Sequence, residues 1–432
     1  MWFLYNVVFA IGFAVLLPHY LRRMRRRGGY GPHFGERLAR YEPGLRARLA
    51  DGGRIWIHAV SVGELYVALR LMETLRARRP ERRFLVSVTT STARRIAEER
   101  VRAPDVLVYF PLDFPSVVRR AFRALRPAAL ILVEGEFWPN LIRRARREGV
   151  PVALVNGRLS DSSFRGYRKV RPLMRRVLRE CALLCVQSET DRERFAALGA
   201  PPDRLHEVGS AKYELPPPDP DRAGEARTVL AAAGVGPDRL VLLGGSTWPG
   251  EEEPLLDAWA ALRPSHPRLA LALAPRHAER AGDVQRLIEG RGLTCRRRTD
   301  ASPPPAAAPD VFLLDTTGEL MSFYGAADIV FVGKSFAEHG GQNVVEPAAW
   351  GKPVLCGPNL ENFPVVARDF REAGAFVQVA DAAALREAVR RLLEDGSARE
   401  SLGRRAAELV RRRAGALGRT VDRLEPILPR GG

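Results

Sequence analysis

The carboxylates best placed for chemistry in this sequence directly follow short apolar runs. Glu64 ends the segment HAVSVGE (58–64) at the start of an expected helix, and Glu134 and Glu136 flank a glycine just after the run 130–133. A carboxylate in the first turn feels the positive end of the helix dipole, so we expect a lowered pKa and an ionised Glu64. An ionised carboxylate there can act as a general base, although a helix cap has the same spacing.

A second set of residues has the chemistry of an anion site. The small residues GGST (244–247) follow an apolar run and precede acids 251–253 at an expected helix start, where backbone N–H groups can hold a phosphate. The lysine of a P-loop is missing, which excludes a P-loop NTPase. Arg276 follows the next apolar run, and its guanidinium suits bidentate phosphate contact. In a chain so rich in arginine, a plain surface residue is the alternative.

The most distinctive segment is a glycine-rich loop followed by an acidic helix. The sequence GKSFAEHGGQNVVEP (333–347) puts Asn343 and Glu346 three residues apart, on one helical face. Amide groups of such a loop can meet a phosphate while the carboxylate accepts hydrogen bonds from ribose hydroxyls. The pattern indicates a nucleotide-sugar site.

These residues lie at the ends of elements that alternate between strand and helix. Expected strands lie at 54–60, 84–88, 106–109, 130–133 and 152–155, and again at 240–243, 269–273, 311–314, 329–332 and 353–355, with helices such as 64–78 and 140–147 between them. Such alternation predicts parallel α/β sheets. The run LPPPDP (215–220) interrupts it, because consecutive prolines form neither helix nor ladder. We therefore expect an α/β protein with two Rossmann-like domains that face a cleft.

The N-terminal segment predicts membrane attachment. Residues 1–21 contain no Asp, Glu, Lys or Arg, and a helix of this length can span a hydrocarbon core of ~30 Å. Trp2, Tyr5 and Tyr20 lie near its ends, where aromatic residues suit the membrane interface. Five arginines follow, the reverse of the order in a secretory signal: Arg22, Arg23, Arg25, Arg26 and Arg27. The positive-inside rule then predicts a single inner-membrane anchor with the remaining chain on the cytoplasmic face. A helix in the membrane interface, or a buried helix interrupted at Pro18, is the alternative.

Composition limits the classes of partner and cofactor. With 46% hydrophobic and 27% charged residues the chain is globular, and a net charge of +18 attracts anions such as nucleic acid, anionic lipid or an acidic substrate. The sequence has no recognised nucleic-acid-binding module, so we expect no nucleic acid partner. The four cysteines, Cys181, Cys185, Cys295 and Cys356, form no C-x-x-C pair and are expected to be reduced core thiols. The D-x-D at 219–221 lies among prolines, so we expect no metal site.

Short motifs run through the whole chain in a fixed order. They are IWIHAVSVGE (55–64), EGEFWPN (134–140), NGRLSDSSFRGY (156–167), GSAKYE (209–214), STWPGEEE (246–253), APRHAER (274–280), DTTGEL (315–320) and HGGQNVVEPAAWGKPVLCGP (339–358). This series resembles the bacterial lipid A Kdo transferases, where Kdo is 3-deoxy-D-manno-octulosonic acid. Gly135 and Gln342 depart from the motif variants of that family, but neither removes a side chain assigned to chemistry.

The resemblance implies a fold, an activity and a set of partners. It implies the GT-B glycosyltransferase fold and an inverting, metal-independent transfer of Kdo from CMP-Kdo to a lipid A precursor in lipopolysaccharide core biosynthesis. No cofactor is implied beyond the donor, and anionic inner-membrane lipids are the remaining partner. Another GT-B nucleotide-sugar enzyme would share the glycine-rich loop but lack HAVSVGE and EGEFWPN. A membrane-tethered polyanion-binding protein is the non-enzymatic alternative, and it rests on charge alone.

The same resemblance implies residue roles and domain bounds. Glu64 falls on the general base, and Glu134 and Lys212 fall on positions that stabilise the transition state. The CMP-binding segments fall on Pro275, Arg276, Thr317, Gly318, Glu319, Asn343, Val344, Val345 and Glu346. We expect an anchor at 1–21, an acceptor-binding domain at 22–214, a linker at 215–221 and a CMP-sugar-binding domain at 222–432. The last helices are expected to cross back to the first domain, and 302–309 to form a surface loop.

Overall fold

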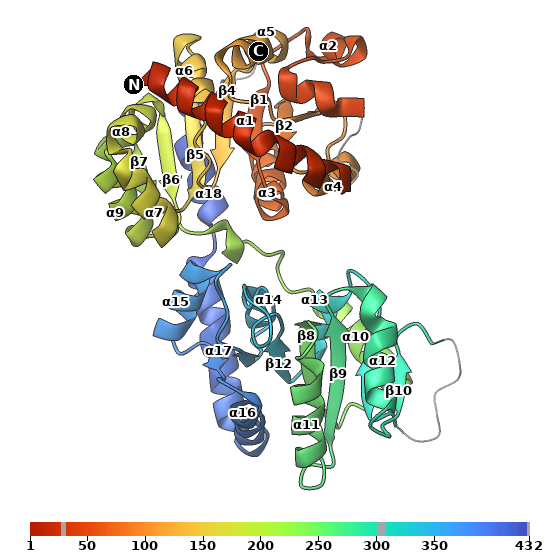
Figure 1. Ribbon diagram of the computed structural model, residues 1–432. Coiled ribbons are helices and arrows are strands. Elements are labelled where there is room, and N and C mark those ends of the chain that lie inside the picture. The colour runs from red at the N-terminus through yellow and green to blue at the C-terminus, as the bar shows by residue number, and fades with distance from the viewer. Residues whose placement is uncertain (27–31, 301–307, 430–432) are drawn as a thin grey trace. The chain divides into compact units, whose positions relative to one another are not determined.

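The computed structural model describes residues 1–26, 32–300 and 308–429 and divides into two compact units (Figure 1). Unit 1 comprises Met1–Glu214 with Gly415–Gly432, and unit 2 comprises Leu215–Ala414. Most of the expected surface loop at 302–309 lies outside the described residues, as does Arg27. The side chains of Tyr20, Arg23, Arg25 and Arg26 lie outside them as well.

Unit 1 is built on a parallel sheet of seven strands in the order β3-β2-β1-β4-β5-β6-β7. The strands are β1 (Ile55–Ala59), β2 (Phe84–Val88), β3 (Val106–Tyr109), β4 (Ala129–Val133), β5 (Val152–Gly157), β6 (Leu183–Val186) and β7 (Leu205–Glu207). Its helices are α1 (Trp2–Arg26), α2 (Pro43–Leu49), α3 (Val62–Arg78), α4 (Ser91–Arg100), α5 (Pro115–Leu125), α6 (Pro139–Arg147), α7 (Asp161–Lys169), α8 (Arg171–Glu180), α9 (Glu189–Leu198) and α18 (Ala416–Leu424), with 3₁₀ turns η1 (Pro32–Leu38), η2 (Pro202–Arg204) and η3 (Ala211–Tyr213). The strand order reverses between β1 and β4, which pair with each other in register.

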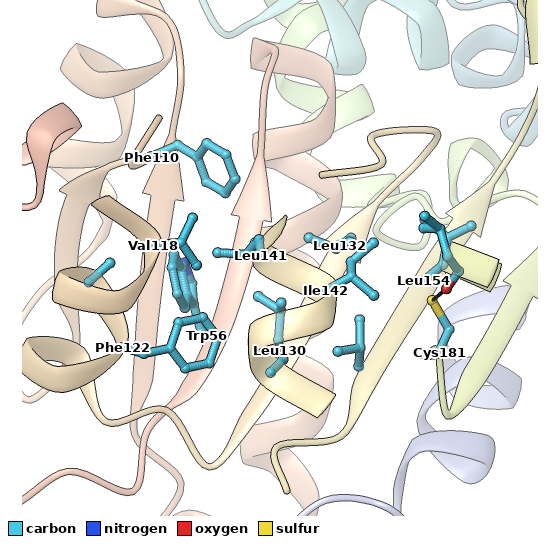
Figure 2. Close-up of a cluster of buried hydrophobic side chains, with 14 of the residues drawn as sticks. Trp56, Phe110, Val118, Phe122, Leu130, Leu132, Leu141, Ile142, Leu154 and Cys181 are labelled. Carbon is cyan, nitrogen blue, oxygen red and sulfur yellow. Dashed lines mark hydrogen bonds between the residues drawn. The ribbon is translucent and has the colours of Figure 1, made fainter. Parts of the chain in front are cut away.

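Alternating apolar residues explain why this sheet is buried on both faces. Trp56, Leu130 and Leu154 point into one core, where α5 and α6 cover the sheet (Figure 2). Their chain neighbours Ile57 and Ile131 point into the opposite core, against α3 and α18. Each fully buried side chain of this kind contributes roughly 1.5–3 kcal/mol relative to exposure in water. Parallel strands covered by helices on both faces need this near-continuous hydrophobicity, which is why sequence patterns detect them well.

The C-terminal helix α18 belongs to unit 1. Its residues Leu417, Val421 and Leu424 are buried in the core beside α3. Glu425, just after the helix, accepts two hydrogen bonds of 2.8 Å from the guanidinium of buried Arg82. Residues far apart in the chain thus complete one face of the first sheet.

Unit 2 repeats the architecture with the strand order β10-β11-β9-β8-β12-β13-β14, again parallel. The strands are β8 (Leu240–Thr247), β9 (Leu269–Pro275), β10 (Cys295–Arg297), β11 (Val311–Leu313), β12 (Ile329–Val332), β13 (Val354–Cys356) and β14 (Val377–Gln378). The helices are α10 (Pro220–Ala232), α11 (Glu252–Leu262), α12 (Ala281–Glu289), α13 (Leu320–Ala326), α14 (Val345–Ala349), α15 (Pro364–Glu372), α16 (Ala382–Glu394) and α17 (Gly396–Arg413), with the turn η4 (Ala278–Arg280). The order reverses between β8 and β12, and the prediction of two parallel α/β domains is confirmed.

The sequence predicts that residues 244–247 follow a strand. In the structure they form the last part of β8 itself. Gly244 and Gly245 are there for close packing. A Cβ on Gly245 would lie 2.7 Å from the ring of Tyr324, so the small residue leaves room for that side chain.

The N-terminal helix α1 runs without a break from Trp2 to Arg26 and passes through Pro18. It therefore extends past the expected end of the anchor, and the proline does not interrupt it. In the described part of the chain it is the one helix that is long and apolar enough to cross a membrane.

Candidate active site

The predicted catalytic carboxylates of unit 1 lie where the strand order reverses. Glu64 lies in the first turn of α3, just after β1, and Glu134 directly follows β4, the neighbouring strand. The carboxyl ends of adjacent parallel strands meet at one edge of the sheet, and ligands of open α/β sheets bind at this reversal. The topology therefore brings both carboxylates to the position where such sheets usually bind substrates.

Glu64 folds back over the start of its own helix. Its Oε2 accepts a hydrogen bond from the Val60 N–H at 2.8 Å, and its Oε1 accepts from the Ser61 hydroxyl at 2.9 Å. Ser61 in turn accepts from the Glu64 N–H at 3.3 Å. These reciprocal bonds form a capping motif, so the helix-cap reading of Glu64 holds. They still leave lone pairs, because an ionised carboxylate offers about four acceptor positions.

The electrostatic expectation for Glu64 is wrong in sign. Burial raises the pKa of this carboxyl to about 7, against the opposing hydrogen bond from Val60, and the charges of Glu134 and Glu136 raise it further. The side chain is only 8% exposed. Desolvation of the charged form thus outweighs the helix dipole, whose effect is usually about 0.3–1 kcal/mol. A carboxyl group with such a pKa can exchange a proton near neutral pH.

Glu134 lies in a charged cluster with residues from the next strands. Its backbone adopts a left-handed conformation with φ of 63°, and its Oε2 accepts from Arg158 Nε at 2.8 Å. Burial, followed by the charge of Glu134, raises the pKa of Glu136. Arg158 follows β5 in the motif NGRLSDSSFRGY, but the sequence alone assigns it no role. The structure makes it the ion-pair partner of Glu134.

Lys212 is brought to the same cluster by the turn η3. Burial lowers its pKa to about 8, with Glu134 acting in the opposite direction and Arg158 in the same one. The turn itself is held from two strand ends. Asn156 Oδ1 accepts from the Ala211 N–H at 3.0 Å, and Gln187 Oε1 accepts from the Ser210 hydroxyl at 3.0 Å.

Asn156 and Gln187 are positioning residues that the sequence analysis does not identify. Asn156 has φ of 51°, and its carbonyl accepts from Gln187 Nε2 at 2.9 Å, so the two side chains form one buried network. An Asn-Gly pair at the end of an expected strand is the available signal, because asparagine tolerates the left-handed region. Unit 1 thus brings Glu64, Glu134 and Lys212 into one electrostatic cluster, and their catalytic roles stay a prediction.

In unit 2, a buried carboxylate organises the loops at the strand reversal. Glu251 is fully buried and accepts hydrogen bonds from the N–H groups of Trp248 at 2.9 Å and Lys334 at 2.7 Å through Oε2. Its Oε1 accepts from the N–H groups of Ser335 at 2.8 Å and Phe336 at 2.9 Å. It therefore joins the loop after β8 to the loop after β12.

This arrangement corrects one expectation about the glycine-rich loop. The amide groups of residues 334–336 donate to Glu251, the Gly340 N–H donates to Glu361 Oε2 at 2.7 Å, and the Gly341 N–H donates to the Lys334 carbonyl at 2.8 Å. These amides hold the loop rather than meet a phosphate.

Tyr324 interacts electrostatically with two of the predicted donor-site residues, Arg276 and Glu346. The ring is fully buried, and burial raises its pKa well above the usual value, with the Glu346 charge adding to the effect. Ser246, which hydrogen-bonds to it, and the charge of Arg276 both act in the opposite direction. Arg276 itself is exposed, and its N–H donates to the Thr247 carbonyl at 3.0 Å. The structure therefore places Arg276 and Glu346 around one tyrosine.

The prediction that Asn343 and Glu346 share a helical face is wrong, because α14 begins at Val345 and Asn343 lies before it, but the two side chains still meet. Asn343 Nδ2 donates to Glu346 Oε1 at 3.2 Å, and Asn343 Oδ1 accepts from the Val345 N–H at 3.2 Å. Val344 and Val345 are buried at the start of α14 and serve as packing for it. The carboxylate and amide side chains are half-buried, with an orientation fixed by each other.

Glu319, in the predicted donor segment 317–319, makes contacts with Arg298 and Thr316 rather than with the other predicted donor residues. Glu319 Oε1 accepts from Arg298 Nη2 at 3.2 Å, and its other oxygen accepts from the Thr316 hydroxyl. Thr317 and Gly318 are exposed, and Gly318 has φ of 94°, a conformation that glycine adopts without strain. Pro275 ends β9, next to β11, so the two segments follow adjacent strands.

An aromatic and basic group beside the strand reversal is not identified from the sequence. The Lys334 ammonium lies 4.6 Å from the Trp248 ring centroid, and the His277 ring packs edge-on against the same indole at 5.5 Å. All three belong to loops after β8, β9 and β12. A cationic group at this edge adds to the positive field near Arg276.

The described residues contain no group of three or more histidine, cysteine, aspartate or glutamate side chains close enough to hold a metal ion. Asp219 of the D-x-D instead caps α10, where its Oδ1 accepts from the N–H of Asp221 at 3.2 Å. Cys181, Cys185 and Cys356 are buried and Cys295 is half-buried, all as free thiols.

Comparison with known proteins identifies the family. Residues 32–215 match the family model described as 3-deoxy-D-manno-octulosonic-acid transferase, and residues 309–409 match glycosyl transferases group 1. A 3-deoxy-D-manno-octulosonic acid transferase of Haemophilus influenzae is 35% identical over 92% of this chain and 93% of its own length. The chain belongs to the 3-deoxy-D-manno-octulosonic acid transferase family. The Bordetella pertussis transferase is also 35% identical, over 94% of this chain and 95% of its own length. This Kdo transferase is therefore a glycosyltransferase.

Solved structures support the fold of the Kdo transferase. The Neisseria meningitidis UDP-GlcNAc 2-epimerase has a TM-score of 0.57 at 12% identity and covers 86% of this chain and 100% of its own. The Anabaena HepE protein in complex with UDP has a TM-score of 0.56 at 14% identity, with the same coverage. At these identities the likeness concerns the fold alone, which is that of the two-Rossmann GT-B proteins.

Proposed function

We propose that this Kdo transferase moves Kdo from CMP-Kdo to a hydroxyl of a lipid A precursor by an inverting, metal-independent reaction. Glu64 is the general base, and Glu134 and Lys212 stabilise the transition state. The observation that carries the proposal is the buried Glu64, whose pKa is raised to about 7, at the strand reversal of unit 1. The efficiency of a general base is greatest when its pKa lies near the working pH.

The proposed step balances as a direct displacement. Glu64 takes the proton of the acceptor hydroxyl while the oxygen of that hydroxyl forms a bond to the anomeric carbon of Kdo. The bond between that carbon and the phosphate oxygen breaks, and CMP leaves with the electron pair. Attack on the face opposite the departing phosphate inverts the configuration. Positive charge develops on the sugar, and the carboxyl group of Glu134, which interacts with Lys212, is suited to balance it.

The donor is proposed to bind unit 2. Arg276 makes a charge-assisted contact with the phosphate, and Glu346, oriented by Asn343, accepts hydrogen bonds from the ribose hydroxyls. The exposed Thr317 and Gly318, with Pro275, Glu319, Val344 and Val345, form the surrounding segments. Fixed cations of the chain take over the charge of the leaving CMP, so that no divalent ion and no further cofactor is required.

Attachment to the cytoplasmic face of the inner membrane fits this acceptor. A lipid A precursor is an anionic glycolipid, and the chain carries a net charge of +18 with an apolar N-terminal helix. Positive charge near an anionic leaflet contributes about 1 kcal/mol per arginine. The membrane therefore concentrates both the enzyme and its acceptor.

Mass analysis of the acceptor tests this function. Membranes carrying the protein are incubated with a tetra-acylated lipid A precursor and a CMP-Kdo-generating system. The proposal predicts a product heavier by one or more Kdo residues, in the presence of EDTA as well as without it. Transfer from another nucleotide sugar, with none from CMP-Kdo, would favour a different GT-B reaction.

A further inference from the structure

One face of α1 packs on unit 1. Phe9 and Phe13 place their rings 5.1 and 5.3 Å from that of Phe114, and the Arg143 guanidinium lies 4.6 Å from the ring centroid of Trp2. Trp2, Phe9 and Phe13 are spaced at helical intervals, so they share a face. In Figure 1 the helix lies along unit 1, with its N-terminal end near α6.

The packed face also carries a buried polar network. The Tyr5 hydroxyl donates to Asp113 Oδ2 at 2.8 Å, and Asp113 is fully buried. Its oxygens accept in addition from the N–H groups of Asn140 at 3.0 Å and Leu141 at 2.8 Å, at the start of α6. Asn140 Nδ2 donates to Asn6 Oδ1 at 2.7 Å. We call Tyr5, Asn6, Asp113 and Asn140 the α1 latch.

The opposite face of α1 is an exposed apolar stripe. Its large residues are Phe3, Leu4, Val8, Ile11 and Val15, with exposed fractions of 81%, 63%, 60%, 60% and 72%. Soluble proteins rarely leave a contiguous apolar surface of this kind in water, and such a surface usually marks a membrane or protein contact. Immediately after it, α1 continues into the arginine-rich residues 22–26.

We propose that α1 lies in the plane of an anionic phospholipid leaflet, with the stripe in the boundary between headgroups and acyl chains and the latch still closed on unit 1. A helix that crossed the bilayer would have to leave Phe114 and break the hydrogen bond from the Tyr5 hydroxyl to Asp113. The buried Asp113 would then lose one of its donors, and an unsatisfied buried polar group is costly. An in-plane helix keeps these contacts, buries the stripe and brings its arginine end to the anionic headgroups.

The latch also links the membrane helix to the candidate acceptor side of the enzyme. Asp113 caps α6 through Asn140 and Leu141, and α6 begins just after the segment 134–138 that contains Glu134. The orientation of α1 does not rest on the proposed reaction. A depth measurement therefore tests the orientation even if the acceptor is a different molecule.

Depth-resolved spin labelling tests the orientation directly. Single cysteines at Leu4, Ile11 and Val15 of the full chain carry a nitroxide, in a background where half-buried Cys295 is replaced by serine. The protein is bound to vesicles of 70% phosphatidylethanolamine and 30% phosphatidylglycerol. In-plane binding predicts similar depths, ~5–10 Å below the headgroups, at all three positions. An upright helix predicts depths that differ by roughly 16 Å between Leu4 and Val15, at 1.5 Å rise per residue.

The alternative results would overturn the proposal. An upright depth gradient means a spanning anchor. Full access of all three nitroxides to an aqueous relaxing agent, together with cross-links between copies through this face, means that a second chain covers the stripe.

A matched pair of substitutions tests the stripe, and a second pair tests the latch. Ala14→Glu on α1 should weaken vesicle binding at least tenfold, whereas Ala231→Glu, at an exposed position on α10, should leave it unchanged. Tyr5→Phe should raise hydrogen exchange about tenfold in α1 and at the start of α6, because the hydrogen bond to buried Asp113 is lost. Tyr66→Phe removes an exposed hydroxyl on α3 and should leave hydrogen exchange unchanged in both segments. Unchanged exchange in Tyr5→Phe would contradict the latch.

Discussion

Ser61 and Glu64 exchange hydrogen bonds at the start of α3: the hydroxyl donates to Oε1 at 2.9 Å, and the Glu64 N–H donates back to the hydroxyl oxygen at 3.3 Å. The same carboxylate is therefore a helix cap and, in the proposed mechanism, also the general base. These roles are compatible, because the cap fixes the side chain beside Glu134 while burial moves its pKa toward neutrality.

The free energy of unfolding should depend on pH because the pKa of Glu64 is raised in the folded state. The folded pKa of Glu64, about 7, is above its ordinary value of 4.5, so the folded state keeps a proton that the unfolded state releases. Glu64 therefore contributes up to about 3 kcal/mol to the free energy of unfolding below pH 4.5, and this contribution is lost as the pH rises through 7. Glu64→Gln should remove this loss, which urea unfolding at pH 5 and pH 8 would measure. An equal pH dependence in both proteins would contradict the raised pKa.

The transfer rate should depend on pH in a bell shape. Deprotonation of Glu64, with a pKa of about 7, raises the rate, and deprotonation of Lys212, with a pKa lowered by burial to about 8, reduces it. We expect the maximum between these values. In Lys212→Arg the alkaline limb should disappear from the accessible range, because a guanidinium stays protonated. An alkaline limb that persists in this variant would exclude Lys212 as its source.

Arg276→Ala and Glu346→Ala should each weaken CMP binding by roughly 10–100-fold, since a charge-assisted hydrogen bond is worth about 1.5–3 kcal/mol. Calorimetric titration with CMP measures the effect. Arg404→Ala removes an exposed arginine of α17 in the same unit and should leave the affinity unchanged. Unaltered CMP affinity in both site variants would refute the donor site around Tyr324.

Glu251→Gln should reduce the free energy of unfolding by about 2 kcal/mol, because two of the four backbone N–H donors would face the side-chain NH₂ group of glutamine instead of an acceptor oxygen. CMP affinity should fall as well, since the loops after β8 and β12 lose their common anchor. Glu279→Gln, exposed in η4, is the control for both measurements. A variant with normal stability would show that the loops do not depend on this carboxylate.

Deletion of residues 1–21 should leave a folded protein that still binds anionic vesicles in low salt. The Debye length falls from ~10 Å at 0.1 M to ~3 Å at 1 M salt, so the remaining electrostatic attachment should be lost at high salt. The full-length protein should stay bound, as sedimentation would show. Complete release of the full-length protein in high salt would mean that α1 is not inserted.

Most of the fold can be predicted from the sequence because short apolar runs locate the buried strands. Apolar runs locate β2 and β3 at their observed bounds, and the motif order places Glu64 and Glu134 at adjacent strand ends. The short edge strands β10 and β14 are missed because they are only partly buried and lack a continuous apolar run.

Burial and long-range contacts explain the other differences. The sign of the Glu64 pKa shift depends on desolvation by side chains distant in sequence, which local spacing does not contain. For the same reason, no pattern near residue 113 reveals that Asp113 joins Tyr5 to the start of α6. The use of the glycine-rich loop amides by Glu251, 83 to 85 residues earlier, is equally invisible in the sequence.

The most direct test of the account compares Kdo transfer and CMP binding in wild-type protein and Glu64→Gln. We predict a loss of turnover of about 10²–10⁴-fold with unchanged CMP affinity, because in the proposed mechanism the base acts on the acceptor and the nucleotide binds unit 2. Near-normal turnover in a folded Glu64→Gln protein would contradict the account and leave Glu64 as a helix cap alone.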